Sequence, residues 1–278
     1  MKAAAFAYAR PADLNAALAL MANADGVTKI IAGGQSLGPM LNLRLVEPDL
    51  IVDISGLSEL KQAERRSDEL VIGACITHGD IEDGRVPDVT RGAMRRVAGA
   101  IAYRAVRNRG TIGGSLSHAD PAADWISALA ALGAKVTLRS LAGTRNLAIE
   151  DFITGALESA LQPGEIVEAV RVPAMTPSAR WGYVKACRKP GEFAHAIAAA
   201  LIDPESATAR AVIGAVEATP IVVGDAAALF GGRVTGDFVR QFDARVADAI
   251  LMKAGVADAA DRHIHVAVLR RAIVEAST

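Results

Sequence analysis

Cysteine is scarce in this chain of 278 residues, which contains only Cys75 and Cys187. Two thiols are too few for a disulfide framework, a four-cysteine iron–sulfur cluster or a tetrathiolate zinc site. Unpaired cysteines are typical of proteins that stay in a reducing compartment. The sequence therefore predicts no metal site on this chain and favours a cytoplasmic location.

Aromatic residues are also few, and a charge excess and long apolar runs are missing. Phe, Trp and Tyr make up 4% of the sequence, and 30 Lys plus Arg nearly balance 31 Asp plus Glu. Without excess positive charge, the chain has no general attraction to nucleic acid or an anionic membrane. No segment approaches the roughly 20 apolar residues of a membrane span. Arg10, Pro11 and Asp13 interrupt the apolar run that a signal peptide would need near the start. We expect no nucleic-acid partner and no transmembrane segment.

The apolar residues that are present, 51% of the chain, follow helix and strand periodicities. In the first third, the patterns predict helices at 12–23 and 36–45 and strands at 27–31 and 50–54. Short strands separated by helices indicate a small α/β unit.

The rest of the chain mixes longer strand and helix patterns, which predicts an α+β fold. The elements predicted up to Pro173 are strands at 69–76, 134–139, 145–149 and 165–172 and helices at 88–106 and 121–132.

Pro173 and Pro177 bracket a polar segment, which indicates a domain boundary. Beyond it we predict a three-stranded antiparallel sheet and a mostly helical tail at 225–276. Strand patterns at 181–189 and 209–216 flank an alanine-rich stretch at 193–201, which is predicted to be a helix.

A first glycine segment, Ala32-Gly33-Gly34-Gln35-Ser36, follows the strand at 27–31 and precedes a helical pattern. Glycines let the backbone approach a ligand closely, and successive N–H groups before a helix form a nest for an anion such as a diphosphate. The segment matches neither the Rossmann nor the Walker A pattern. A tight strand–helix turn without a ligand is the alternative interpretation.

A second glycine segment, Thr111-Ile112-Gly113-Gly114-Ser115, is predicted to be a loop and runs on toward Asp120 and Asp124. Asp120 is better placed to cap the next helix, whereas the Asp124 side chain can face a ligand or accept hydrogen bonds from sugar hydroxyls. His118 is interpreted as a structural residue rather than a base. Two such segments can hold the two ends of one long anionic ligand.

The stretches AGGQSLGPMLNLRL and TIGGSLSHADPAAD closely resemble the paired signatures of the FAD-binding medium subunits of molybdenum hydroxylases, which include carbon monoxide dehydrogenase and xanthine dehydrogenase. The resemblance covers essentially the whole chain. It implies an FAD-binding domain of the vanillyl-alcohol oxidase and p-cresol methylhydroxylase type at 1–176, with subdomains at about 1–57 and 58–176. A C-terminal domain would follow at 177–278.

The resemblance also implies roles for individual residues. The first segment, with Lys29 nearby, would wrap the FAD diphosphate, and the second would contact the diphosphate and ribityl chain. Ser115 stands where the family usually has Asn, which alters one hydrogen bond. No catalytic residue is implied on this chain. The cofactor-binding residues it implies are Lys29, Ala32, Gly33, Gly34, Gln35, Ser36, Ile101, Thr111, Ile112, Gly113, Gly114, Ser115, Asp124, Leu161, Lys185 and Phe193.

Lys185 would lie beside the flavin and Phe193 over its ring; without the resemblance, a solvated lysine and a core phenylalanine are the alternatives. The family further implies a large partner with molybdopterin, a small partner with two [2Fe–2S] clusters, and an external electron acceptor, commonly in a dimer of heterotrimers. Electrons would pass from the clusters to FAD on this chain. The competing hypotheses are a self-contained flavin oxidase or dehydrogenase of the same fold, and a nucleotide-binding module without redox function.

Overall fold

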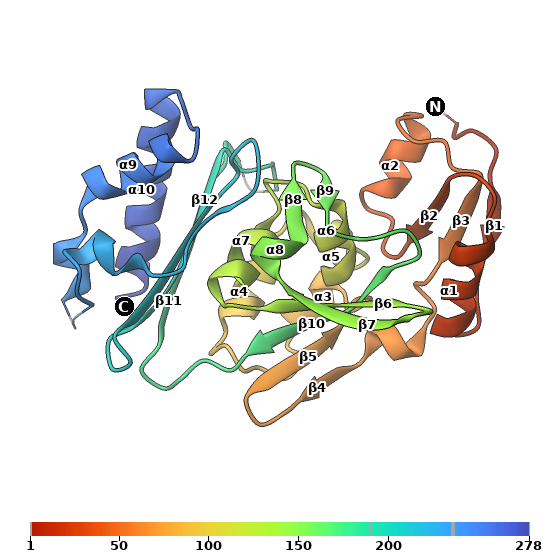
Figure 1. The fold of residues 1–278 in the computed structure, drawn as a ribbon, viewed down its shortest axis with the longest axis horizontal. Coiled ribbons are helices and arrows are strands. Elements are labelled where there is room, and N and C mark those ends of the chain that lie inside the picture. The colour runs from red at the N-terminus through yellow and green to blue at the C-terminus, as the bar shows by residue number, and fades with distance from the viewer. Residues whose placement is uncertain (1, 190, 235–236, 278) are drawn as a thin grey trace.

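The computed structural model describes residues 2–189, 191–234 and 237–277, which form three main sheets and their covering helices. Figure 1 shows these parts side by side, with the N-terminal unit at one end and the last two helices at the other. No helix in these ranges combines the length and apolar character needed to cross a bilayer.

The N-terminal unit is a small parallel sheet with the strand order β1-β3-β2. Its strands are β1 (Ala7–Ala9), β2 (Thr28–Ile31) and β3 (Leu50–Asp53), and its helices are α1 (Leu14–Asn23) and α2 (Leu37–Asn42). Helix α1 begins at Asp13, whose carboxylate accepts the backbone N–H of Ala16 at 2.7 Å. The predicted α/β unit is present, and β2 is an edge strand that leads straight into the first glycine segment.

The central unit is a five-stranded sheet with the order β4-β5-β10-β6-β7. Its strands are β4 (Ala63–Arg65), β5 (Glu69–Gly73), β6 (Lys135–Ser140), β7 (Gly143–Ala148) and β10 (Ile166–Pro173). Its helices are α3 (His78–Glu82), α4 (Ala93–Ala100), α5 (Arg104–Arg107), α6 (Ile112–His118), α7 (Asp124–Ala131) and α8 (Ile149–Phe152). A short hairpin, β8 (Ile153–Gly155) and β9 (Glu158–Ser159), and the 3-10 helix η1 (Ser58–Lys61) complete this part.

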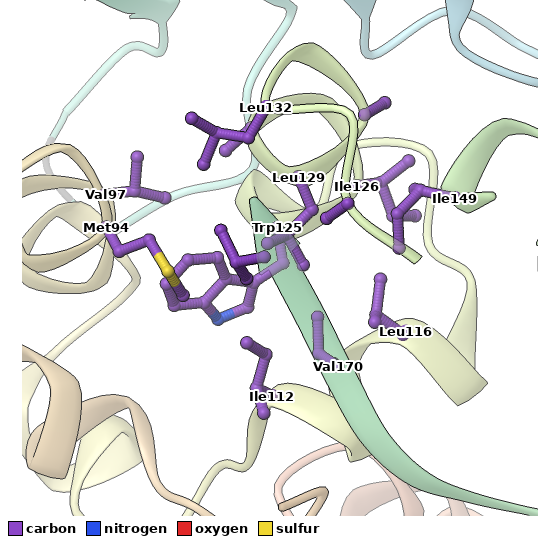
Figure 2. Close-up of a cluster of buried hydrophobic side chains, with 14 of the residues drawn as sticks. Met94, Val97, Ile112, Leu116, Trp125, Ile126, Leu129, Leu132, Ile149 and Val170 are labelled. Atoms are coloured by element: carbon purple, nitrogen blue, oxygen red, sulfur yellow. The ribbon is translucent and has the colours of Figure 1, made fainter. Parts of the chain in front are cut away.

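The core of the central unit is built around Trp125, which is completely buried. Figure 2 shows its indole ring among Met94, Ile112 and aliphatic side chains of α7. Although aromatics are few, this one fills the largest volume of the cluster, and truncation of such a residue typically costs about 3–5 kcal/mol. This packing fixes the start of α7, and with it Asp124.

The C-terminal unit is an antiparallel sheet with the order β11-β12-β13-β14. Its elements are β11 (Arg180–Ala186), β12 (Ala196–Asp203), β13 (Thr208–Gly214), β14 (Ile221–Val223), η2 (Ala226–Phe230), η3 (Phe238–Gln241), α9 (Ala244–Lys253) and α10 (Ala259–Glu275). The sheet therefore has four strands rather than the three predicted. Helix α10 packs on one face of β11 and β12, while α7 packs on the other face of β12 and β13 (Figure 1).

Two helix predictions were wrong for identifiable physical reasons. The alanine-rich stretch at 193–201 overlaps strand β12, which is covered on both faces, so small residues fit there and no polar–apolar alternation marks the strand. The helix predicted at 88–106 is divided into α4 and α5 by Ala102, whose φ of 40° is left-handed and breaks the helix.

Candidate functional site

A cavity of about 780 Å³ lies where the three units meet, within the roughly 300–1,000 Å³ typical of ligand sites. Its wall is formed by the first glycine segment, the start of α6, the end of α4, β10, and the β11–β12 connection. Every residue predicted to bind the cofactor lines this cavity except Ile112. The Ile112 side chain is fully buried in the core, and its N–H donates to the Ile76 carbonyl at 3.1 Å.

The first glycine segment has the geometry of an anion nest. Gly34 adopts a left-handed φ of 70°. In the helical turn that follows, the N–H of Gly38 donates to the Gly34 carbonyl and the N–H of Met40 donates to the Ser36 carbonyl. Within the described residues, the N–H groups from Gly33 to Ser36 donate to no acceptor of the chain. Free N–H groups at the start of a helix suit a phosphate, and the exposed Lys29 adds a positive charge at the same wall.

The second glycine segment is not a loop, and it is not a second nest. It forms the first turn of α6, with the Thr111 hydroxyl accepting the Gly114 N–H at 3.1 Å. The N–H of Gly113 donates to Ala74 at 3.0 Å, and that of Ser115 donates to Thr111 at 3.0 Å. These donors are therefore already used. The glycine at 113 is required for packing, because a Cβ atom there would lie 2.9 Å from the Ala74 Cα atom.

The first glycine segment touches the backbone that leads directly into the second. A Cβ atom on Gly33 would lie 2.6 Å from the Arg109 carbonyl carbon and 2.9 Å from the Gly110 Cα atom, closer than side chains tolerate. Glycine is thus needed at Gly33 for close backbone approach. The contact places the nest beside the start of α6, so one ligand can touch both segments.

Asp124 and Lys185 form an ion pair at another part of the cavity wall. The Lys185 ammonium donates to Asp124 at 2.8 Å and to the Ala100 carbonyl at 2.7 Å. The Tyr183 hydroxyl also donates to Asp124, at 2.7 Å. Burial, followed by the nearby carboxylate, raises the pKa of Tyr183, so the phenol stays a donor. An ammonium group has three donors, so Lys185 keeps one for a ligand.

Helix α7 starts three residues later than predicted, after Ala123 rather than at Pro121. Asp120 does not cap this helix: its carboxylate accepts the Ala122 N–H at 2.9 Å and closes the preceding turn. Asp124 is the first helical residue and is only 8% exposed. It is one of the residues that line the cavity.

The apolar residues predicted to contact the cofactor line the cavity and differ in their exposure. Phe193 is 73% exposed, while Ile101 and Leu161 are half-buried. Phe193 is therefore not a core residue, and its exposed ring is available to cover a planar ligand.

Arg107 holds the backbone turn after α4. Its guanidinium donates to the carbonyls of Ile101 at 2.9 Å and Ala102 at 3.1 Å, and it is paired with Glu82 at 2.7 and 2.9 Å. These bonds stabilise the left-handed Ala102 at the cavity wall. No sequence motif marked Arg107, because its partners are brought together only by the fold.

His78 is another cavity residue that the sequence did not reveal. It follows the helix-capping Thr77 and is 5% exposed, and its Nδ1 atom accepts the Trp125 indole N–H at 3.0 Å. Burial, with the nearby Arg107 charge, lowers the pKa of His78 to about 4, so the ring is neutral at pH 7. His118, which the sequence did single out, lies in the same wall.

The described residues contain no group of three or more side chains arranged to hold a metal ion. The cavity offers donors for an anion, a lysine–aspartate pair and an exposed aromatic ring. These features together suit an anionic ligand that also carries hydroxyl groups and a planar ring.

Comparison with known proteins identifies the cofactor. Residues 4–175 match the family described as the FAD binding domain in molybdopterin dehydrogenase, and the chain belongs to this family. The resemblance to FAD-binding medium subunits and the α+β fold class are thereby confirmed.

Individual relatives extend the match to most of the chain. Caffeine dehydrogenase subunit beta from Pseudomonas sp. (strain CBB1) is 36% identical over 225 residues, which cover 80% of this chain and 76% of that one. The carbon monoxide dehydrogenase medium chain of Hydrogenophaga pseudoflava is 32% identical over 191 residues, covering 69% and 67%. In the solved structure of carbon monoxide dehydrogenase from Hydrogenophaga pseudoflava, a chain superposes with a TM-score of 0.88 at 28% identity, covering 99% and 98%.

Proposed function

We propose that this chain is the FAD-binding electron-transfer subunit of a heterotrimeric molybdenum hydroxylase. The observation that carries the proposal is that the glycine nest, the Asp124–Lys185 pair and Phe193 line one and the same cavity. Family membership supports FAD as the occupant. We further propose a cytoplasmic location, which the two free cysteines favour.

The residues of the cavity fit FAD in a specific way. The free N–H groups from Gly33 to Ser36 would hold the diphosphate, and Lys29 would offset part of its charge. Asp124 would accept hydrogen bonds from hydroxyl groups, and the remaining donor of Lys185 would face the flavin. The exposed Phe193 would cover the ring and exclude water from it. When bound, FAD supplies the capacity to take up two electrons and release them to an acceptor.

The charge beside the flavin is balanced rather than purely positive, because Lys185 is held by Asp124. A lysine with a carboxylate partner favours extra negative charge on the flavin less strongly than a free lysine would. The Tyr183 hydroxyl donates to the same carboxylate and helps to hold the pair in one geometry.

The proposed partners are a large subunit with molybdopterin and a small subunit with two [2Fe–2S] clusters. Support comes from relatives named as a beta subunit and as a medium chain, both parts of larger assemblies. We propose a dimer of such heterotrimers and an external electron acceptor. The relatives are named for caffeine and for carbon monoxide, so similarity in this subunit carries no substrate assignment.

We also propose that residues 1–176 form the FAD-binding domain, with subdomains at about 1–57 and 58–176, and that 177–278 form a C-terminal domain. The family match at 4–175 and the separate sheets support this division. Lys185 and Phe193 would then reach the FAD from the second domain.

The test is co-expression of this chain with its neighbouring genes, followed by purification through a tag on this chain. We expect flavin absorbance near 450 nm, two additional polypeptides, iron and molybdenum. The Gly33→Ala variant serves as a control and should co-purify the partners with less flavin. Substrate turnover by this chain alone would instead establish a self-contained flavoenzyme, and a colourless chain that takes up no FAD would refute the proposal.

A further inference from the structure

His78 lies at the point where the two glycine segments meet. An isolated bridge pairs Thr77 with Thr111, and the backbone N–H of His78 donates to the Gly110 carbonyl at 2.9 Å. The imidazole lies against Gly110, because a Cβ atom on that glycine would be 2.9 Å from both Cδ2 and Nε2 of His78. Gly110 in turn contacts Gly33, the first residue of the nest. The ring is therefore next to the proposed diphosphate position.

The tautomer of His78 is fixed by its neighbour. An indole N–H can only donate, so the Nδ1 atom that receives it from Trp125 must be unprotonated. In a neutral imidazole the other nitrogen carries the hydrogen, and burial keeps the ring neutral. Nε2–H is thus a hydrogen-bond donor with a fixed direction.

This donor has no acceptor in the described ranges of the chain. His78 is 5% exposed and lines the cavity. Its Nε2 atom is nevertheless not fully enclosed by protein and keeps some accessible surface. The Nε2–H group therefore reaches the open space of the cavity. An unpaired donor in such a place destabilises the folded protein unless a ligand or a water molecule accepts a hydrogen bond from it.

We propose that Nε2–H of His78 donates a hydrogen bond to a diphosphate oxygen of the bound FAD. This inference rests on the proposed function. The neutral ring adds a directed donor to the nest without adding net charge, and Trp125 acts as a positioning residue by fixing the tautomer. The pair extends the binding site from the backbone into the core of the central unit.

The test uses the full chain stripped of flavin and two matched variants. In His78→Asn, the amide oxygen can still accept from Trp125, but no donor reaches the former Nε2 position. In His78→Gln, the amide nitrogen reaches that position. We expect His78→Asn to raise the Kd for FAD about tenfold to a hundredfold, as for loss of a hydrogen bond to a charged group. His78→Gln should recover most of the affinity.

A second readout reports the contact directly. In a protein labelled with ¹⁵N-histidine, the resonance that His78→Asn removes should belong to a neutral ring with the proton on Nε2. We expect ADP and FAD to shift this resonance and riboflavin to leave it in place, because riboflavin lacks the diphosphate.

Three results would overturn the contact alone: unchanged FAD affinity in His78→Asn, a response to riboflavin but not to ADP, or equal losses of affinity and stability in both variants, which would indicate packing. Failure of the unsubstituted chain to bind FAD would overturn the proposed function and this contact with it.

Discussion

Replacing Gly33 with alanine should separate the two glycine segments. The new Cβ atom would overlap the Arg109 carbonyl oxygen and lie 2.6 Å from its carbonyl carbon, where ordinary contact begins at 3.4 Å, so the backbones must part by more than about 0.8 Å. Overpacking of this kind typically costs about 1–3 kcal/mol in the free energy of unfolding. Because the nest must lie against α6 for one ligand to touch both, the Kd for FAD should rise about tenfold to a hundredfold.

The assay is a fluorescence titration of the flavin-free chain with FAD, together with urea unfolding. Gly38→Ala is the matched control, because a Cβ atom at Gly38 meets nothing within 4 Å. Its stability should be unchanged or higher by up to about 1 kcal/mol, since alanine favours a helix more than glycine does. If Gly33→Ala matched the control in both affinity and stability, the contact between the segments would not be what fixes the site.

Three further perturbations probe the cavity wall. The folded-state pKa of His78, about 4, lies below the 6.5 of an ordinary histidine, so its contribution is complete above pH 6.5 and is lost as the pH falls toward 4. The loss is on the order of 3 kcal/mol, and His78→Asn should flatten urea-unfolding stability across that window. Lys185→Met should lower the free energy of unfolding by about 3 kcal/mol, because it strands the nearly buried Asp124, and should make the flavin reduction potential more negative in potentiometric titration. Arg107→Lys should cost about 2 kcal/mol in thermal unfolding, whereas Arg104→Lys, whose side chain is 45% rather than 12% exposed, should cost less than about 1. Equal losses in the two arginine variants would contradict the role given to the turn after α4.

Local patterns predicted the N-terminal unit well, because its helices and strands carry their own signals. Pro11 and Asp13 precede α1, and the strand at 27–31 coincides with β2 apart from its first residue. The resemblance of the two glycine segments then located most of the cavity wall. These are properties of short stretches, which can be identified from one sequence without knowledge of the fold.

The errors arose where distant segments decide the local structure. The second glycine segment became helical because Ala74 and Ile76 accept its N–H groups, and these lie on a different part of the chain. Likewise, His78 gained its role from Trp125, which is far from it in sequence. Side chains that work through tertiary partners leave no periodic signal, so they could be found only in the folded structure.

Strand β12 contributes to two cores at once. Ile197 and Ala199 face the core that contains Trp125, while Ala198 and Ile202 face the core under α10. Neither core can open without exposing the other, so heating should melt the central and C-terminal units in one calorimetric transition. Amide hydrogens along this strand should therefore exchange only through global unfolding. A cofactor held between Gly33 and Lys185 would then raise the melting temperature of the whole chain, not only that of the N-terminal unit that contains the nest.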